Sequence, residues 1–313
     1  KKYKMKAKFS KFKAIDKIRR FRGIFPTRLN KIRLDANERV SSFQLKFIKN
    51  IKKKINSDHF TAYPEIEKIY DLLSQKYKLN RLNFLIASGS DSGIRHCFEL
   101  FTKPNSKIIT LTPTFGMYDV YAKTFQTKQV KISYDKKLKL NTALLFKNLR
   151  KDVSMVMIAN PNSPTGTIIE HKKLIDIIIK AKQCNCYVVI DEAYFGFYKK
   201  TLLPLVKKYN NLVILRTFSK AIGMAGIRAG FIVSNKKTIK RLYAFRPMYE
   251  ISSIAAVVVE QIIKKDKITN NYIKETLEGK KYLIKEISKL GLNYYKTYSN
   301  FMLVDFKNKI SDN

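Results

Sequence analysis

The sequence predicts an α/β protein whose core is a mostly parallel, seven-stranded sheet with helices on both faces. Between about residues 84 and 234, short β-branched runs alternate with helix-length segments. Strands that alternate with helices in this way form parallel sheets that are covered on both sides. The 313 residues suffice for a large core and a smaller second domain, and the composition, 45% hydrophobic and 28% charged, is typical of a folded protein.

The elements can be assigned in order along the chain. A helix is expected at 64–77, after an extended arm rich in Lys and Arg, and two more at 251–264 and 269–290. The seven strands of the sheet are expected at 84–87, 107–111, 129–133, 155–159, 187–190, 212–215 and 229–233, and two short strands at 292–295 and 301–306.

This order predicts a division into domains. We expect residues 1–60 to form an N-terminal arm and part of a small domain, 61–245 a large domain, and 246–313 a small α+β C-terminal domain. The chain begins with Lys1 instead of Met and stops soon after Phe306, so we expect a fragment with a truncated small domain.

The formal net charge of +39 raises the question of a nucleic-acid or membrane partner. Lysine is spread over the whole length, which is typical of a compositional bias, and no zinc-finger spacing or RNA-recognition signature accompanies it. No apolar run is long enough to cross a bilayer or to form the core of a signal peptide. We therefore expect a cytoplasmic protein without a nucleic-acid or membrane partner.

The cysteines and histidines indicate neither disulfides nor a metal site. Cys97, Cys184 and Cys186 are an odd number in a chain without an export signal, which argues against a disulfide framework. The three histidines, His59, His96 and His171, are scattered without metal-ligand spacing. We expect no metal.

One predicted strand ends in an acidic pair. Residues 188–194 read Val-Val-Ile-Asp-Glu-Ala-Tyr, which places Asp191 at the carboxyl end of a buried strand. Open α/β sheets bind their ligands at that edge. A carboxylate in this place is also common as a helix cap or a metal ligand, so Asp191 alone leaves the function open.

A lysine follows another predicted strand among small and apolar residues. Residues 216–230 read Arg-Thr-Phe-Ser-Lys-Ala-Ile-Gly-Met-Ala-Gly-Ile-Arg-Ala-Gly. Such neighbours desolvate the ammonium of Lys220, which lowers its pKa and makes the amine available for imine formation. Thr217, Ser219 and Arg228 supply two hydroxyls and a guanidinium of the kind that hold a phosphate dianion.

A glycine turn and two proline-containing loops complete the set of motifs. Residues 87–94 read Ala-Ser-Gly-Ser-Asp-Ser-Gly-Ile, a strand end that opens a helix. The free N–H groups of that helix start can bind an anion, although a plain Ser or Asp cap explains the pattern equally well. The two loops are Thr-Pro-Thr-Phe-Gly-Met-Tyr at 112–118 and Asn-Pro-Asn-Ser-Pro-Thr-Gly at 160–166.

In this order, GSDSG, PTFGMY, NPNSPTG, DEAY and TFSKxxGxxGxRxG resemble the motifs of the fold-type I pyridoxal-phosphate-dependent aminotransferases. The histidinol-phosphate aminotransferase-like branch is the most similar part of that family. The resemblance covers roughly residues 34–306, from Leu-Asp-Ala-Asn-Glu onward. It implies the fold-type I architecture, with 61–245 as the cofactor-binding domain, and pyridoxal 5'-phosphate as the cofactor.

The resemblance also implies a role for individual residues. Lys220 corresponds to the lysine that holds the cofactor as a Schiff base and carries the α-proton, Asp191 to the partner of the pyridine nitrogen, and Tyr194 to the donor to the phenolate oxygen. The residues expected around the rest of the cofactor are Ser90, Asp91, Thr217, Ser219 and Arg228 at the phosphate and Phe115 on the ring face. Tyr63, in Ala-Tyr-Pro-Glu, would reach the phosphate of a neighbouring subunit, which implies a homodimer.

Two departures from the family pattern stand out. Ser163 replaces the usual Asn before Pro-Thr-Gly, so either its hydroxyl substitutes at the phenolate oxygen or Asn162 turns in. The family's arginine that binds the substrate carboxylate belongs to a C-terminal strand beyond this sequence.

The reaction that the resemblance implies is transfer of an amino group to 2-oxoglutarate. The donor would be an amino acid or a phosphorylated amino alcohol such as histidinol phosphate; an aromatic amino acid or an amino-alcohol phosphate of polysaccharide synthesis fits as well. Two alternatives remain open: decarboxylation of a phosphorylated amino acid on the same scaffold, and a catalytically silent basic binding protein.

Residues 246–249, Arg-Pro-Met-Tyr, follow the last helix of the large domain and either contact a substrate anion or form a plain hinge.

Overall fold

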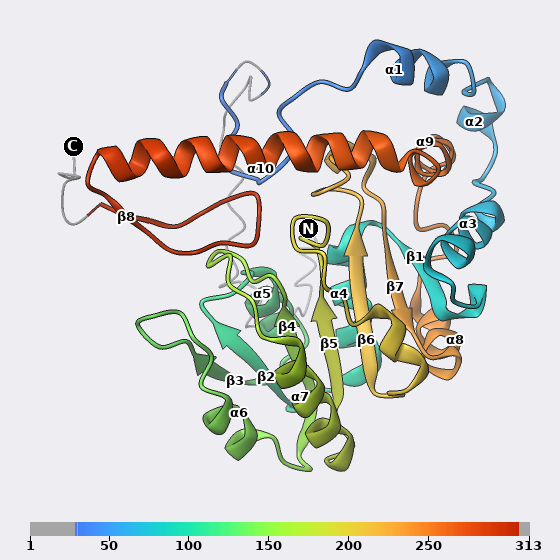
Figure 1. Ribbon diagram of the computed structural model, residues 1–313. Coiled ribbons are helices and arrows are strands. Elements are labelled where there is room, and N and C mark those ends of the chain that lie inside the picture. The colour runs from blue at the N-terminus through green and yellow to red at the C-terminus, as the bar shows by residue number, and fades with distance from the viewer. Residues whose placement is uncertain (1–28, 30, 307–313) are drawn as a thin grey trace, which may run out of the picture.

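The computed structural model describes residue 29 and residues 31–306, and its centre is a seven-stranded sheet (Figure 1). The sheet order is β1-β7-β6-β5-β4-β2-β3, and all neighbours are parallel except that β7 is antiparallel to both β1 and β6. The strands are β1 (Phe84–Ala87), β2 (Lys107–Thr112), β3 (Lys128–Ser133), β4 (Val153–Ala159), β5 (Tyr187–Asp191), β6 (Leu212–Thr217) and β7 (Gly230–Ser234). The predicted fold class is confirmed.

Helices cover both faces of the sheet, which accounts for the continuous apolar runs of the central strands. In Figure 1, α7 (His171–Gln183) lies in front of the sheet and α4 (Gly89–Phe101) behind it. Alternate residues of a strand point to opposite faces. Val189 accordingly packs in the cluster with α4, while Val188 packs in the cluster on the α7 side.

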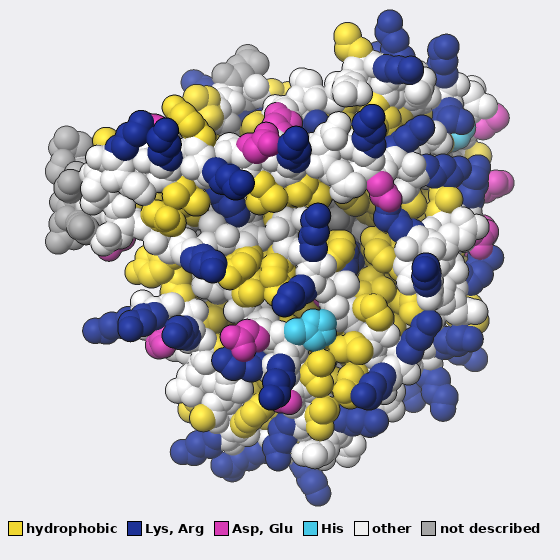
Figure 2. All heavy atoms as spheres, in the orientation of Figure 1, with side chains coloured by type: hydrophobic (Ala, Val, Ile, Leu, Met, Phe, Trp, Pro, Cys, Tyr) yellow, Lys and Arg dark blue, Asp and Glu magenta, His cyan; other side chains and the backbone are white. Residues whose placement is uncertain are grey.

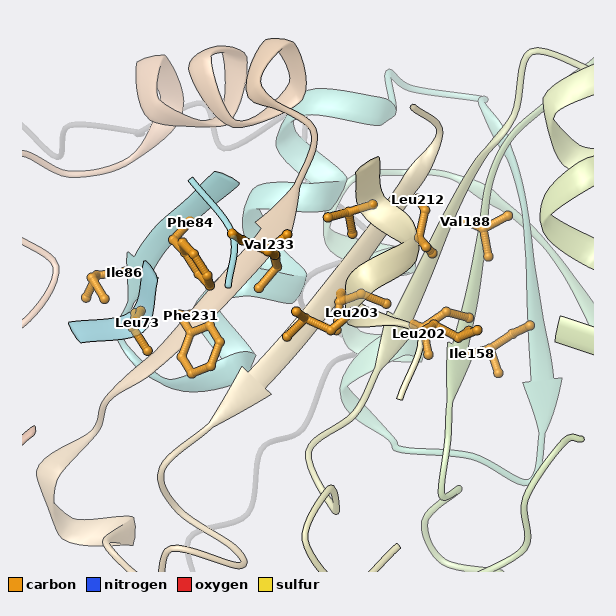
Figure 3. Packing of buried hydrophobic residues seen from close by; sticks show 14 of the residues in the cluster. Leu73, Phe84, Ile86, Ile158, Val188, Leu202, Leu203, Leu212, Phe231 and Val233 are labelled. Atoms are coloured by element: carbon orange, nitrogen blue, oxygen red, sulfur yellow. The ribbon is translucent and has the colours of Figure 1, made fainter. Parts of the chain in front are cut away.

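Each face has its own apolar cluster. The cluster behind the sheet includes residues of α4, α5 (Met117–Thr124) and α8 (Lys236–Phe245). The larger cluster, on the other face, is formed with α3 (Glu67–Tyr77), α7, α9 (Ser253–Ile263) and the 3-10 turn η4 (Leu203–Lys207). Figure 3 shows part of it, where Leu202 and Leu203 pack over the strands that carry Ile158, Val188 and Leu212. The small helix α6 (Thr142–Asn148) lies beside α7.

The remaining described elements lie outside this sheet. The long helix α10 (Asp266–Lys289) crosses the molecule on the side toward which β5 and β6 point, and a short antiparallel pair, β8 (Asn293–Tyr294) and β9 (Val304–Asp305), follows it (Figure 1). Two short helices, α1 (Leu45–Lys52) and α2 (Asp58–Thr61), precede α3. No helix in the described part of the chain is long and apolar enough to span a membrane.

The predicted helices and strands all have counterparts; the strand at 84–87 has the predicted ends, and most others differ by one to three residues. The helix expected at 64–77 begins at Glu67, the one expected at 269–290 begins at Asp266, and the two last strands are only two residues long each. The division into domains stays a prediction. The parts of it that fall on residues 1–28, 30 and 307–313 lie outside the described residues.

The basic residues are spread over the surface. Figure 2 shows Lys and Arg side chains over all parts of the visible face, with no single stripe. Lys and Arg number 63 against 24 Asp and Glu, so the excess of positive charge follows from the composition of the chain.

Candidate functional site

Several strands end at one edge of the sheet, and this edge gathers most of the predicted site residues. Asp191 is the last residue of β5 and pairs in register with Leu215 of β6. Gly230, the first residue of β7, pairs with both Ala87 and Thr217. Because β7 runs in the opposite direction, its start meets the ends of β1 and β6 at the same edge.

Asp191 is a buried carboxylate with two hydrogen-bond donors. It is 4% exposed, and it accepts from the Tyr118 hydroxyl at Oδ2 (3.1 Å) and from the Ala193 backbone N–H at Oδ1 (3.0 Å). Like Val189, two residues earlier, it points to the α4 and α5 side, where Tyr118 lies. Burial raises the pKa of Asp191 to about 6, although the two hydrogen bonds lower it.

Lys220 is half-buried and hydrogen-bonded to the N-terminal segment. Its Nζ donates to the Ala36 carbonyl oxygen at 2.7 Å and lies 5.8 Å from the centre of the Tyr194 ring. Desolvation lowers the pKa of the Lys220 ammonium, and the nearby carboxylates of Glu38 and Asp191 oppose this shift. Asp191 and Lys220 thus act on each other electrostatically, as two groups of one site.

Tyr194 is buried between residues from distant parts of the chain. Its hydroxyl accepts a hydrogen bond from Nδ2 of Asn37 at 3.1 Å, and Phe301 meets its ring edge-on at 5.1 Å. Burial raises the pKa of Tyr194, while hydrogen bonds with Asn37 and Ser163 lower it. The Ser163 hydroxyl is therefore within hydrogen-bonding reach of Tyr194.

Asn162 has a different environment from Ser163. It is buried, its Oδ1 accepts from the Thr114 hydroxyl (2.7 Å), and its Nδ2 donates to the Pro113 carbonyl oxygen (2.9 Å) and to Thr165 (2.8 Å). The amide thus holds two loops together. Of the two alternatives that the sequence leaves open, Ser163 is the residue that lies beside Tyr194.

A concave group of donors lies where β1, β6 and β7 meet; we call it the anion cup. It consists of the backbone at Gly89 and Ser90 and the side chains of Thr217, Ser219 and Arg228. Arg228 Nη1 donates to the Ser219 hydroxyl (3.3 Å), and the Thr217 hydroxyl donates to Ser219 (3.0 Å).

Two glycines allow the backbone of the anion cup to close. Gly89 has a φ of +77°, and a Cβ there would come within 2.8 Å of Nη2 of Arg228. A Cβ on Gly230 would come within 2.8 Å of the Ser90 amide nitrogen. A side chain at Gly89 would fill the space between the first turn of α4 and the guanidinium, and one at Gly230 would collide with the backbone of that turn.

The other predicted site residues lie around or away from this centre. Asp91 accepts a hydrogen bond from the Tyr121 hydroxyl (3.3 Å), so its carboxylate is directed toward α5. Phe115 is 38% exposed and meets Tyr118 edge-on at 5.8 Å. Tyr63 is 75% exposed and stacks on Tyr249 at 4.1 Å, beside a separate surface hollow of about 820 Å³.

The sequence assigns no role to Tyr118 and Asn37, which the structure brings to Asp191 and Tyr194. Both residues stand inside motifs that the sequence makes visible, Tyr118 in PTFGMY and Asn37 in LDANE. Membership of a motif was the only signal, because each contact spans a long stretch of chain.

The sequence model of a known family, described as aminotransferase class I and II, matches residues 30–312. The chain belongs to this family. It is 34% identical over 278 residues to a histidinol-phosphate aminotransferase of Clostridium novyi (strain NT), a match that covers 88% of this chain and 77% of that protein. A histidinol-phosphate aminotransferase of Thermoanaerobacter sp. (strain X514) is 33% identical, with 88% and 78% covered.

Solved structures show the same fold. The histidinol-phosphate aminotransferase of Sinorhizobium meliloti, solved in complex with pyridoxal-5'-phosphate, matches with a TM-score of 0.85 at 19% identity, covering 97% of this chain and 84% of that chain. The L-threonine-O-3-phosphate decarboxylase of Porphyromonas gingivalis matches with a TM-score of 0.73 at 18% identity, covering 86% and 84%. At these identities the likeness shows the fold alone.

The protein is a pyridoxal-phosphate-dependent aminotransferase. The residues present fit the cofactor. A carboxylate as buried as Asp191 calls for a positive partner, which a protonated pyridine nitrogen provides. The anion cup offers a guanidinium, hydroxyls and helix-end N–H groups, the donor set that a phosphate dianion requires.

Proposed function

We propose that this aminotransferase moves an amino group from a histidinol-phosphate-like donor to 2-oxoglutarate, with the cofactor attached through Lys220. One observation carries the proposal: a lysine with a lowered pKa and a buried carboxylate with a raised pKa share one strand edge with an anion cup. Pyridoxal phosphate needs an amine for its aldehyde, a carboxylate for its ring nitrogen and an anion site for its phosphate, and these three groups supply them.

The residues have separable tasks in binding. Asp191 would hold a proton at the ring nitrogen of the cofactor, because a cation stabilises its buried carboxylate. Tyr194, which has Asn37 and Ser163 as hydrogen-bond partners, would donate to the cofactor's phenolate oxygen. The anion cup would bind the phosphate, and Phe115 would cover the ring.

The chemistry requires a base that takes the proton from the α-carbon of the substrate and delivers it to a second carbon. When bound, pyridoxal phosphate supplies an electron sink for the negative charge that breaking a Cα–H bond leaves behind. Lys220 is the base, because burial keeps a fraction of its amine unprotonated. The Ala36 carbonyl oxygen holds that amine in place while it carries the proton.

The substrate proposal is supported by the relatives' names. The two relatives described above, which are more than 30% identical, are histidinol-phosphate aminotransferases. Decarboxylation of a phosphorylated amino acid remains the competing reaction, because a decarboxylase shares the fold. The products distinguish them: release of carbon dioxide without an oxo acid would establish a decarboxylase.

We also propose a homodimer in which Tyr63 reaches the phosphate of the neighbouring subunit. Tyr63 is exposed and stacks on Tyr249, which is itself partly exposed. The exposed side chain of Met248 lines the same surface hollow as Tyr63. Sedimentation of the loaded enzyme, together with a Tyr63→Phe variant, tests this: a monomer with full activity would refute the shared site.

The decisive experiment is the substitution Lys220→Ala. The variant should lose turnover and the visible absorbance of the cofactor bound through the lysine, while Lys180→Ala, which changes an exposed lysine of α7, should keep both. Full activity in Lys220→Ala would refute the assignment. A screen of amino donors, with 2-oxoglutarate as the acceptor and glutamate as the measured product, then identifies the substrate.

A further inference from the structure

A buried ion pair lies directly behind the first turn of α4. His96, in the middle of that helix, approaches Oε1 of Glu250 with Nε2 (2.5 Å) and Oε2 of Glu99 with Nδ1 (2.9 Å). The side chain of His96 is 3% exposed and that of Glu250 is 2% exposed. Both ring nitrogens face carboxylates, an arrangement that favours the doubly protonated imidazolium.

The electrostatics agree with this charge state. Burial alone would lower the pKa of His96, but hydrogen bonds and charges from Glu250 and Glu99 raise it. Burial alone would raise the pKa of Glu250, but His96 and the N–H and O–H donors around it lower it. Each partner therefore stabilises the charge of the other.

The second oxygen of Glu250 binds the start of α4. Oε2 accepts from the Ser88 backbone N–H (3.1 Å) and from the Ser92 hydroxyl (3.2 Å). Ser88 is the N-cap residue of α4, yet its own side chain makes no capping bond. The residues next to Ser88 are Gly89 and Ser90, the backbone part of the anion cup.

Glu250 comes from the segment that joins α8 to α9, far from α4 in sequence. Its neighbour Tyr249 stacks on Tyr63, and the Ser253 hydroxyl donates to the Ala62 carbonyl oxygen at 2.8 Å. One carboxylate thus connects the anion cup to the segment that carries Tyr63.

We propose that His96 and Glu250 form a positioning pair that fixes the first turn of α4, and thereby sets the affinity of the anion cup for the cofactor's phosphate. This inference rests on the proposed function, because it takes the anion cup as the phosphate site. His96 acts through Glu250 and touches neither substrate nor cofactor.

The test compares two ligands that differ only in the phosphate. Apoprotein is titrated with pyridoxal phosphate and with pyridoxal, and binding is followed by absorbance. In Glu250→Gln the dissociation constant for pyridoxal phosphate should rise about tenfold or more, while that for pyridoxal changes by less than about twofold. His96→Gln should act in the same direction, and Ser92→Ala, a milder change, should give a smaller shift.

Two control variants separate positioning from general damage. Arg95→Ala removes the exposed partner of Glu99 on the same helix and should leave both constants unchanged. Asn211→Ala removes a buried amide that bonds the Ile178 and Cys186 carbonyl oxygens outside the anion cup. It should lower thermal stability without changing the ratio of the two constants.

A second measurement needs no cofactor. In the apoprotein, hydrogen exchange at the amides of residues 93–95, the first in α4 with acceptors inside the helix, should be faster in Glu250→Gln than in wild type, and unchanged in Asn211→Ala. The proposal is overturned if Glu250→Gln weakens both ligands equally, or if the ratio and the exchange rates stay at wild-type values. A wild type that gives no absorbance change with pyridoxal phosphate would refute the proposed function instead, and the exchange rates would still show whether Glu250 fixes the turn.

Discussion

The hydroxyl of Tyr118 donates to Oδ2 of Asp191 at 3.1 Å, and both side chains are buried. Burial disfavours the charged carboxylate, whereas a hydrogen bond to the charged form favours it. In the protein without cofactor, the hydrogen bond from Tyr118 therefore increases the fraction of Asp191 that is ionised. Two predictions follow from this pair, and two more from the residues around it.

The first prediction concerns the pH dependence of stability. Burial raises the pKa of Asp191 in the folded apoprotein to about 6 from its ordinary value of 3.8, so the folded state binds more protons than the unfolded state between these values. The free energy of unfolding should therefore fall by about 2 kcal/mol as the pH rises from about 4 to about 7. The amide of Asp191→Asn does not titrate, so this variant should not show this part of the pH dependence.

Denaturant unfolding of both apoproteins at pH 4 and pH 7 measures the effect. The stability of Asp191→Asn relative to wild type should increase by that amount between the two pH values. A difference that does not change with pH would contradict the raised pKa.

The second prediction is that Tyr118→Phe weakens the enzyme while leaving the fold intact. The variant keeps the ring and loses one hydrogen bond to the carboxylate, so the pKa of Asp191 should rise further and less of it should be charged. The rate should fall about tenfold, which corresponds to about 1.4 kcal/mol. Steady-state kinetics measure it, and an unchanged rate would show that the hydrogen bond has no role.

The third prediction contrasts two glycines. Gly89→Ala should weaken pyridoxal-phosphate binding strongly, because the new Cβ would meet the Arg228 guanidinium at 2.8 Å and the backbone has a φ of +77°. Gly279, inside α10, has no atom within 4 Å of an added Cβ, and Gly279→Ala should stabilise the protein by about 0.5 to 1 kcal/mol. Cofactor titration and thermal unfolding of both variants decide it; equal cofactor affinity in the two would contradict the anion cup.

The fourth prediction concerns Asn37, whose Nδ2 donates to the Tyr194 hydroxyl at 3.1 Å. Asn37→Ala should lower the rate about tenfold, because the Tyr194 hydroxyl loses a donor. Asn37 also has a φ of +51°, which an alanine tolerates poorly. Asn37→Gly removes that strain and should be equally slow.

Asn105 provides a matched control for the backbone effect. It is exposed and has a φ of +67°, without a contact to Tyr194. Asn105→Ala should therefore lose stability alone and keep the rate. If Asn37→Gly recovered the wild-type rate, the effect at position 37 would lie in the backbone and the amide would have no part in it.

The sequence predicts the strands well, because β-branched runs of four to seven residues between helical segments are a local signal. It does not predict the direction of β7. The run Gly-Phe-Ile-Val-Ser is equally apolar in either direction, and only its pairing with β1 and β6 shows that it is antiparallel. The first residues of α3 and α10 also differ from the predicted ones by three positions, because helix ends depend on tertiary contacts.

The sequence predicts which residues come together at the sheet edge where they stand at or just after a strand end, as Asp191 does in β5 and Lys220 does after β6. Contacts across long stretches of chain are not predictable in this way. Tyr118 and Asp191 are 73 residues apart, and Asn37 and Tyr194 are 157 residues apart. His96 looks isolated in the sequence because its carboxylate partner, Glu250, follows 154 residues later.

The position of β7 between β1 and β6 has a consequence for the order of assembly. Gly230 packs against the backbone of Gly89 and Ser90, which are translated about 140 residues earlier. A nascent chain emerging from the ribosome can form β2 to β6 in sequence, yet β1 acquires its neighbour in the sheet only when the stretch up to Ser234 is available. With the anion cup as the proposed phosphate site, a chain that terminates before Ser234 would lack a complete binding site for the vitamin-derived coenzyme.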